Sequence, residues 1–322
     1  MFLRDINPTI NGEKTMNKQN FGTILALMTA VISGIAIPLN KVFVVGIDAT
    51  VFTAARALII GLVFLLIAGF QSGFDFSRFK KAGWKHLIFI GVVGGGLAFL
   101  MYFSGLQLTT TGRAAFLHKT LPVFAGIFAA AFLKERIPRR HWYALLMMLI
   151  GAFMIYFSRI PLSAMWSNPG LGDALVIGAT VLWAAENTVA RKVMKEGESN
   201  LIVSFSRMFI GSLLLFGIIG LTGKIDVLLS LNGVQVANLF ISTAMLFGYV
   251  FFWYWSIKHV EISKATALLL LAPVISLAMG VWWFNEPFPI AQMIGSILIL
   301  FGAWWVIQIN SKKRIERELT GI

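Results

Sequence analysis

The segment RAAFLHKTLPVFAGIFAAAFLKERIP, from Arg113 to Pro138, is long enough to cross a bilayer and carries a proline near its middle. The pattern returns 151 residues later as KATALLLLAPVISLAMGVWWFNEPFP, from Lys264 to Pro289. Both copies keep the central proline and the glutamate that follows the apolar run: Pro122 with Pro273, and Glu135 with Glu286. Lys119, in contrast, falls on Leu270. The two segments therefore predict a doubled membrane scaffold that carries this charge in one half only.

Composition places the whole chain in the membrane class. Its 322 residues are 58% hydrophobic and 13% charged, whereas a soluble domain averages about 25% charged residues. Long apolar runs recur throughout, which indicates transmembrane helices. The absence of cysteine excludes disulfides and cysteine-based metal or redox chemistry. We therefore expect an all-α membrane protein that has the lipid bilayer around it.

Ten membrane-spanning helices are expected, at about 20 residues each. Their predicted limits are 21–44, 49–70, 86–108, 111–133, 140–158, 171–191, 199–221, 234–257, 263–285 and 288–308. Residues 1–20 form a polar N-terminal tail, in which Met16 is an alternative start, and 309–322 form a basic tail. The loops between spans are short, so no separate soluble domain is expected.

The positive charges predict an orientation. Of the 27 Lys and Arg residues, 20 fall on the side of the membrane that receives both termini and the loops near Lys85, Lys134, Lys195 and Lys258. Four fall on the opposite side, and three lie inside predicted spans. Because positive charge collects on the cytoplasmic side, we predict a plasma (inner) membrane protein with both termini in the cytoplasm. The net charge of +13 is thus explained by topology, and no nucleic-acid partner is expected.

The repeat extends beyond the opening segment. Residues 21–158 and 171–308 each hold five predicted spans, and the same 151-residue offset relates Arg56 to Arg207 without a gap. An odd number of spans turns the second unit upside down relative to the first, so the units form an inverted repeat. Many secondary transporters build two alternating gates around one midplane site in this way. A duplicated membrane protein without transport remains the alternative.

These features resemble a known family. Two five-helix units, each with a proline in its fourth helix and a glutamate at that helix's end, are similar to the drug/metabolite transporter superfamily. Within it, LKERIPRRHWYALLMMLIGAFMI and FNEPFPIAQMIGSILILFGAWWV resemble EamA-type repeats. The resemblance covers about residues 21–308. It implies a ten-helix fold, small metabolites such as amino acids as substrates, commonly export, and a central cavity lined mainly by helices 1, 3, 4, 6, 8 and 9.

Residues found in both halves are expected to serve the fold. The arginines are expected to bond helix-end carbonyls of their own repeat, and the glutamates to face the N–H groups of the next helix. Substrate contact and proton transfer are the alternatives for these charges. The prolines each remove one backbone hydrogen bond and predict a hinge or a static kink. The predicted structural charges are Arg56, Arg207, Glu135 and Glu286, and the predicted hinge positions are Pro122 and Pro273.

Polar residues found in one half only are better candidates for substrate binding. Lys119 and His118 map onto leucines, and Glu186 and Asn187 map onto Ile35 and Ala36. A charge at a helix centre is costly to insert and usually faces the bundle interior. We predict that Lys119 binds a substrate carboxylate and Glu186 its ammonium group or a coupling proton. A purely structural ion pair between the two helices is the alternative.

Aromatic residues complete the predicted site. Tyr102, Trp183, Tyr249 and Trp253 lie on helix faces with small or polar neighbours, which suits the wall of a cavity. Trp and Tyr also serve as anchors at the membrane interface, and that alternative stays open. The glycines beside them, Gly91, Gly95 and Gly105, favour close helix packing.

The sequence predicts no other chemistry. The four histidines lack metal-ligand spacing, HExxH and GxSxG motifs are absent, and the phosphate-loop likeness at Gly223–Lys224 is incomplete. We therefore predict no metal, no cofactor and no enzymatic activity. The predicted function is secondary active transport, by alternating access, of a small polar or zwitterionic metabolite such as an amino acid, coupled to protons or to exchange. The resemblance implies that the direction is outward. A non-transporting scaffold and a membrane-embedded enzyme without a recognisable motif are the alternatives, and the oligomeric state is left open.

Overall fold

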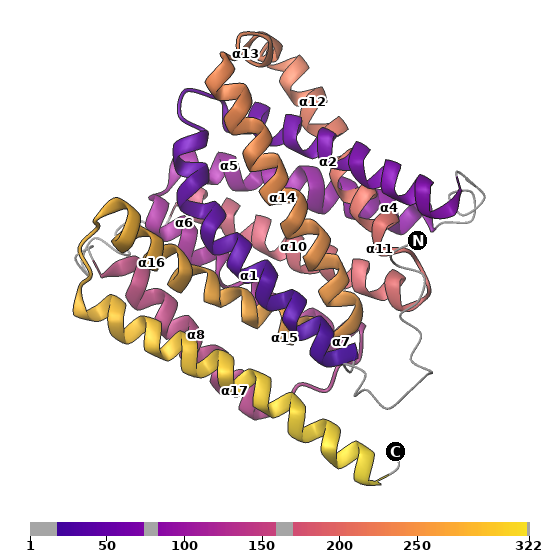
Figure 1. The fold of residues 1–322 in the computed structure, drawn as a ribbon, viewed down its shortest axis with the longest axis vertical. Coiled ribbons are helices and arrows are strands. Elements are labelled where there is room, and N and C mark those ends of the chain that lie inside the picture. Colours follow the sequence, from indigo (N-terminus) through magenta and orange to yellow (C-terminus); the bar gives the residue numbers. More distant parts are fainter. Residues whose placement is uncertain (1–17, 74–82, 159–169, 321–322) are drawn as a thin grey trace.

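The structure, a computed structural model, describes residues 18–73, 83–158 and 170–320. The predicted N-terminal tail lies almost wholly outside these residues. Within them the chain is helical throughout, without β-strands (Figure 1). This confirms the all-α fold class.

In the described part of the chain, ten helical segments are long enough to cross a membrane, and several are built from consecutive shorter elements. In chain order they are α1 (Lys18–Phe43), α2 (Ala49–Ser72), α4 (Trp84–Phe89) with η1 (Ile90–Leu97) and α5 (Ala98–Leu108), α6 (Thr111–His118) with α7 (Leu121–Phe132), α8 (Arg139–Phe157), α10 (Leu171–Lys195), α11 (Asn200–Phe205) with η2 (Ser206–Ile210) and α12 (Gly211–Leu221), α14 (Gly233–His259), α15 (Ile262–Leu268) with η3 (Leu269–Leu271) and α16 (Ala272–Phe284), and α17 (Ile290–Thr320). A short helix, α13 (Ile225–Leu229), lies between α12 and α14.

Among the described residues, nine of these segments are apolar enough to be recognised as spans by hydropathy. The tenth, α10, carries Asp173, Glu186 and Arg191, yet these three side chains are buried. The described segment that falls outside these nine is thus an interior helix, which is where a charged residue within the membrane is expected.

Local backbone geometry repeats with the sequence. Lys134 and Asn285, 151 residues apart, both adopt the left-handed conformation with φ of 55° and 51°. Directly after each, a glutamate N–H donates back across the turn, from Glu135 to the carbonyl of Ala129 and from Glu286 to that of Gly280. Each bond joins residues six positions apart, one position more than the 6→1 bond of a Schellman motif. Both copies therefore end α7 and α16 by the same device.

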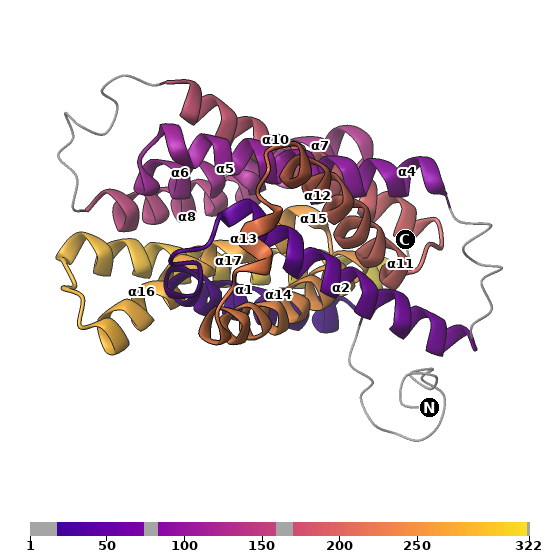
Figure 2. The same cartoon turned by 90° about the horizontal axis from the view of Figure 1, so that it is seen from above.

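The helices form two layers (Figure 2). One layer contains α5, α6, α7 and α10, and the other contains α1, α14, α15 and α16. In each layer the first helix of one half packs on the third and fourth spans of the other half: α10 on α5 and α7, and α1 on α14 and α16. In both layers, the first helix of one half thus packs against helices of the other half.

Close backbone contacts hold the flanking helices. α8 crosses α17 where Gly151 and Gly295 meet, since a Cβ on either glycine would lie within 2.5 Å of the other's carbonyl oxygen. The π-helical turns η1 and η2 pack against each other, and a Cβ at Gly95 would meet the Arg207 carbonyl oxygen at 1.9 Å. Gly91, Gly95 and Gly105 therefore pack helices, as their spacing predicts.

The fourth span is broken. It was expected as one helix over 111–133, but α6 ends at His118 and α7 begins at Leu121, with Lys119 and Thr120 between them. Pro122 is the second residue of α7, where its missing N–H is not needed. The equivalent ninth span stays wound through the short 3₁₀ turn η3 before Pro273. The sequence repeat is therefore accompanied by a local difference at the break.

Candidate functional site

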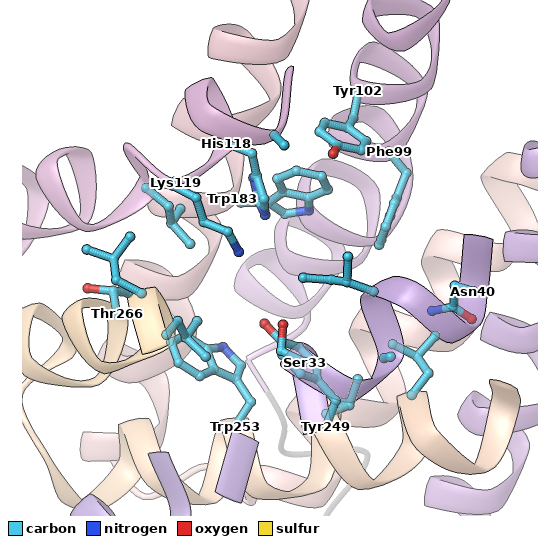
Figure 3. Close-up of a pocket in the computed structure, with 18 of the residues that line it drawn as sticks. Ser33, Asn40, Phe99, Tyr102, His118, Lys119, Trp183, Tyr249, Trp253 and Thr266 are labelled. Carbon is cyan, nitrogen blue, oxygen red and sulfur yellow. The ribbon is translucent and has the colours of Figure 1, made fainter. Parts of the chain in front are cut away.

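A cavity of about 560 Å³ lies between the two layers (Figure 3). Its volume is within the range of small-molecule sites. Both layers contribute to its wall. The polar and aromatic residues that line it are Ser33, Asn40, Phe99, Tyr102, Phe103, Thr111, His118, Lys119, Tyr156, Trp183, Asn187, Arg207, Tyr249, Trp253 and Thr266.

Lys119 enters the cavity from the break in the fourth span. It is the C-cap of α6, and Figure 3 shows its side chain directed into the space between Trp183 and Trp253. Among the described residues, its ammonium group has no hydrogen-bond or ion-pair partner. The break also leaves α7 to begin at the cavity wall with Leu121 and Pro122, and the N-terminus of a helix favours negative charge. Both features favour an anionic group in front of Lys119.

Aromatic rings surround that position. The ring of Trp183 lies 4.9 Å from His118, 5.4 Å from Tyr102 and 5.2 Å from Phe99, measured between centroids. Opposite them, Tyr249 and Trp253 stack at 6.4 Å with their planes 12° apart. The predicted aromatic residues therefore all line the cavity.

Hydrogen bonds fix the two indole rings. Trp183 Nε1 donates to the carbonyl of Gly94 at 3.0 Å, and Trp253 Nε1 donates to Asn187 Oδ1 at 2.7 Å. Asn187 Nδ2 in turn donates to the carbonyl of Trp183 at 2.8 Å. Asn187 thus joins the two aromatic walls, and its amide is already engaged by protein groups.

Glu186 lies behind the wall instead of on it. Its side chain is fully buried, is absent from the described lining of the cavity, and faces Arg207 at 3.7 Å. The Tyr254 hydroxyl donates to the same carboxylate. The structure therefore does not bring Glu186 together with Lys119. The reason is that Arg207, which lines the cavity, pairs with the Glu186 carboxylate.

The two shared arginines have different partners. Arg207 lines the cavity, pairs with Glu186 and donates to the Tyr254 hydroxyl at 3.2 Å. Arg56 instead donates to Ser242 Oγ at 2.7 Å and packs on the ring of Phe52. In their described contacts both bond to side chains, so the expectation of helix-end carbonyls within one repeat is wrong. The packing of α2 on α14 places the Arg56 guanidinium group beside Ser242. Arg207 belongs to the π turn η2, and its guanidinium group lies beside Glu186 and Tyr254.

The two shared glutamates also differ. Glu135 forms a buried ion pair with Arg191 at 2.7 Å and accepts hydrogen bonds from Ile262 N at 3.4 Å and Ser263 Oγ at 3.5 Å. It therefore faces the N-terminus of α15, in the other half, and not that of α8, which follows it in sequence. Glu286 is half-buried, and its carboxylate lies close to Gly280.

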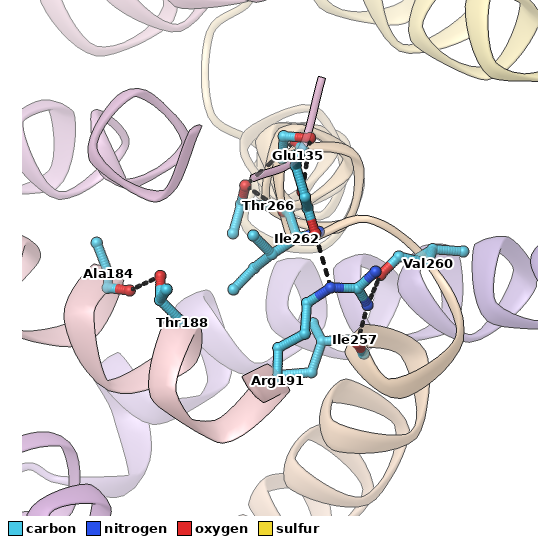
Figure 4. A network of polar contacts seen from close by, with 9 residues as sticks. Glu135, Ala184, Thr188, Arg191, Ile257, Val260, Ile262 and Thr266 are labelled. Atoms are coloured by element: carbon cyan, nitrogen blue, oxygen red, sulfur yellow. Dashed lines mark hydrogen bonds and ion pairs between the residues drawn. The ribbon is translucent and has the colours of Figure 1, made fainter. Parts of the chain in front are cut away.

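Two features of the site were missed by the sequence reasoning. Arg191, the last residue of the span predicted over 171–191, belongs to the charges assigned above to the loop near Lys195, yet it is buried against Glu135 and donates to the carbonyls of Ile257 and Val260 (Figure 4). Arg207 was assigned to the fold, although it lines the cavity. The signal for Arg191 was present, because its equivalent in the first half is Asn40, a difference as informative as Lys119 against Leu270.

Electrostatically, the cavity wall is positive. The charged residues among the described lining are Lys119 and Arg207, and the described lining holds no carboxylate. Arg207 is neutralised from behind by Glu186, whereas Lys119 is not paired. An aromatic-lined cavity with one unpaired ammonium group can hold the carboxylate of an otherwise apolar molecule. Pro122 lies in this wall, whereas Pro273 is outside the described lining.

Comparisons with known proteins agree on one family. The model of the EamA-like transporter family matches residues 20–157 and again 170–308. An uncharacterized transporter of Bacillus subtilis, YyaM, is 23% identical over 282 residues, covering 87% of this chain and 91% of that protein. The pseudopaline exporter CntI of Pseudomonas aeruginosa is 36% identical over 94 residues, 29% of this chain and 31% of that protein. A solved crystal structure superposes with a TM-score of 0.73 at 20% identity, covering 90% of this chain and 98% of that one.

Proposed function

Because this chain belongs to the EamA-like transporter family, we propose that it is a secondary active transporter that exports a small carboxylate with an apolar or aromatic body. It is a multi-pass membrane transporter and not an enzyme. The observation that carries the proposed substrate class is the unpaired ammonium group of Lys119 inside an aromatic cavity whose described lining has no carboxylate.

The substrate lies with its carboxylate at Lys119 and its body against the rings of Trp183 and Trp253. Burying the carboxylate is tolerable only if it is paired and hydrogen-bonded there. Amino acids with apolar side chains belong to this class. Their ammonium group would rest against the ring faces, because Arg207 separates Glu186 from the cavity. This replaces the expected pairing of the substrate ammonium with Glu186.

Glu186 is the proposed site of proton coupling, with substrate exchange as the alternative drive. A carboxylate that approaches Arg207 from the cavity competes with Glu186 for the same guanidinium group. Glu186 is then left buried with a weakened partner, which favours its protonation. Substrate binding and proton binding are linked through Arg207 in this way.

The orientation and direction are part of the proposal. The lysine and arginine distribution supports a plasma (inner) membrane location with both termini in the cytoplasm. Outward transport is supported by the similarity to the pseudopaline exporter. The inverted relation of the two halves is supported by their five spans each and by the exchanged packing of α1 and α10.

Counterflow in proteoliposomes tests this function. Vesicles holding purified protein are preloaded with a panel of aromatic and branched carboxylates, and the uptake of each labelled compound is compared with uptake of its primary amide and its decarboxylated amine. We expect uptake of carboxylates that requires the protein and is lost in Lys119→Met. Uptake of amides or amines at the same rate, or no uptake above protein-free vesicles, would contradict the proposal.

A further inference from the structure

A cluster of buried polar contacts, which we call the latch, lies next to the cavity-lining Thr266 and contains Glu135, Arg191, Ile257, Val260, Ile262 and Ser263 (Figure 4). Arg191 belongs to the α10 layer, and the other layer supplies the carbonyls at the end of α14 and the N–H at the start of α15. All six residues are at most 9% exposed. The latch therefore ties the two layers together, and a contact of this kind can close one end of the cavity.

The charges of the latch suit the helix ends that they meet. The Arg191 guanidinium group bonds the carbonyls of Ile257 and Val260, where α14 ends and its dipole is negative. The Glu135 carboxylate accepts from the N–H of Ile262, where α15 begins and the dipole is positive. The ion pair between them thus bridges the turn from α14 to α15. Each charge compensates the unpaired backbone groups of one helix end.

The opposite end of the cavity carries the equivalent residues in an open arrangement. Moving each latch position by 151 residues gives Glu286, Asn40, Leu106, Thr109, Thr111 and Gly112. Four of these, Asn40, Leu106, Thr111 and Gly112, line the cavity, and none of the six is buried. The same positions are therefore buried and joined at one end of the cavity and accessible at the other.

We infer that Glu286 closes this open end by docking at the turn between α5 and α6, in the place that Glu135 takes between α14 and α15. The inference rests on the proposed transport function, because alternating access requires a second closure. Glu286 follows the same left-handed residue and the same backbone hydrogen bond as Glu135. Its helix end is therefore shaped to present the carboxylate in the same way.

Other ion pairs near the open end do not cross the cavity. Arg113 pairs with Asp173 at 3.1 Å, but this contact joins α6 to α10 inside one layer. Lys224 pairs with Asp48 at 2.6 Å outside the two layers that form the wall. Neither contact joins the two layers.

The two closures differ in one decisive residue. Where Arg191 gives the latch a positive partner, the open end has Asn40, whose amide accepts from Ser242, itself bonded by Arg56. A neutral amide cannot form the ion pair, and it brings no positive charge to the negative end of a helix dipole. The outer closure is therefore the weaker one, and the chain rests with the Glu286 end open.

Electron spin resonance distances test this inference without any substrate. The chain has no cysteine, so spin labels can be placed at Leu108 and Trp282, both strongly exposed beside the open end, and at the equivalent Ala131 and His259 beside the latch. In purified full-length protein we expect Asn40→Arg to shorten the Leu108–Trp282 distances and to lengthen the Ala131–His259 distances. Asn40→Gln is the matched control and should leave both unchanged.

A double variant separates docking from mere obstruction. Asn40→Arg with Glu286→Gln should restore the parent distances, because the new arginine then lacks its carboxylate. Distances unchanged in Asn40→Arg, or shortened equally in the double variant, would overturn the inference. These distances are independent of flux, so a failure of the transport proposal would show in vesicles and a failure of the gate would show here.

Discussion

The fourth and ninth spans have equivalent sequences and similar helix endings, but they differ at the residues that face the cavity. Each ends with a left-handed residue, a glutamate and a proline, and each has a proline near its middle. The fourth span opens at Lys119 and presents an unpaired ammonium group to the cavity, whereas the ninth stays wound at Leu270. The glutamate at the end of the fourth span, Glu135, pairs with Arg191, whereas the residue equivalent to Arg191 in the first half is Asn40. The two halves thus share a helix ending and differ at the cavity-facing position and at the residue that meets the ending.

The largest expected difference between the halves is in stability. Glu135→Gln leaves the buried Arg191 without its ion pair, which typically costs about 3–5 kcal/mol. Glu286→Gln, at the equivalent but accessible position, should cost less than about 1 kcal/mol. The measurement is the apparent unfolding temperature of both purified variants in the same detergent. Equal losses would show that the latch contributes nothing beyond the shared helix ending.

The next comparison is between two equivalent positions, Lys119 in the fourth span and Leu270 in the ninth. Lys119→Met should reduce carboxylate transport at least about 100-fold, because about 2.7 kcal/mol is a modest value for losing a buried charge-assisted contact. Leu270→Met, which also changes a lining residue at the equivalent position, should leave the rate within about twofold. Initial rates in proteoliposomes at equal protein content are compared. A normal rate in Lys119→Met would remove the proposed substrate contact.

Much of this comparison could be predicted from sequence. The ten spans, the 151-residue repeat and the aromatic residues all follow from apolar periodicity and from matching one half against the other. The partner of a buried charge does not, because it depends on which helices meet in three dimensions. Glu186 therefore could be recognised as an interior charge, but its pairing with Arg207 instead of Lys119 could not. The interruption of the helix at Lys119 could not be predicted either, because a proline indicates a disturbed helix but not which residues leave it.

A smaller effect is expected from the charge behind the wall. Glu186→Gln keeps the shape of the side chain but frees Arg207 from its carboxylate, so carboxylate affinity should rise several-fold, on the order of 1 kcal/mol. The same variant should make the transport rate insensitive to an imposed pH gradient while exchange continues. Tyr254→Phe removes the neighbouring hydroxyl and no charge, and it should keep the pH response. A persistent pH response in Glu186→Gln would assign coupling elsewhere.

The smallest expected effect is at the loop before α2. Asp48 caps that helix through the N–H groups of Thr50 and Val51 and pairs with Lys224. Partial burial raises the pKa of Asp48, but hydrogen bonds from Lys224 and from these backbone groups outweigh it and hold the pKa below its usual value of 3.8. A lowered pKa stabilises the fold above pH 3.8, and this contribution is lost as the pH falls through the folded-state value.

Asp48→Asn should therefore lower stability by less than about 1 kcal/mol at pH 7, since asparagine still caps the helix and the pair is partly exposed. The difference from the parent should vanish in acid, once Asp48 is protonated. Denaturant midpoints at pH 7 and in acid measure this. A deficit that is independent of pH would show that the ion pair has no role.

The central claim, that Lys119 receives a carboxylate inside the aromatic cavity, is tested most directly by ligand-induced stabilisation. Purified parent protein, Lys119→Met and Leu270→Met are heated with an aromatic carboxylate found active in counterflow and with its primary amide. Saturation at 100 times the dissociation constant stabilises a native state by about 2.7 kcal/mol. The account predicts stabilisation of the parent and of Leu270→Met by the carboxylate only, and none of Lys119→Met. Equal stabilisation by the amide, or undiminished stabilisation of Lys119→Met, would contradict it.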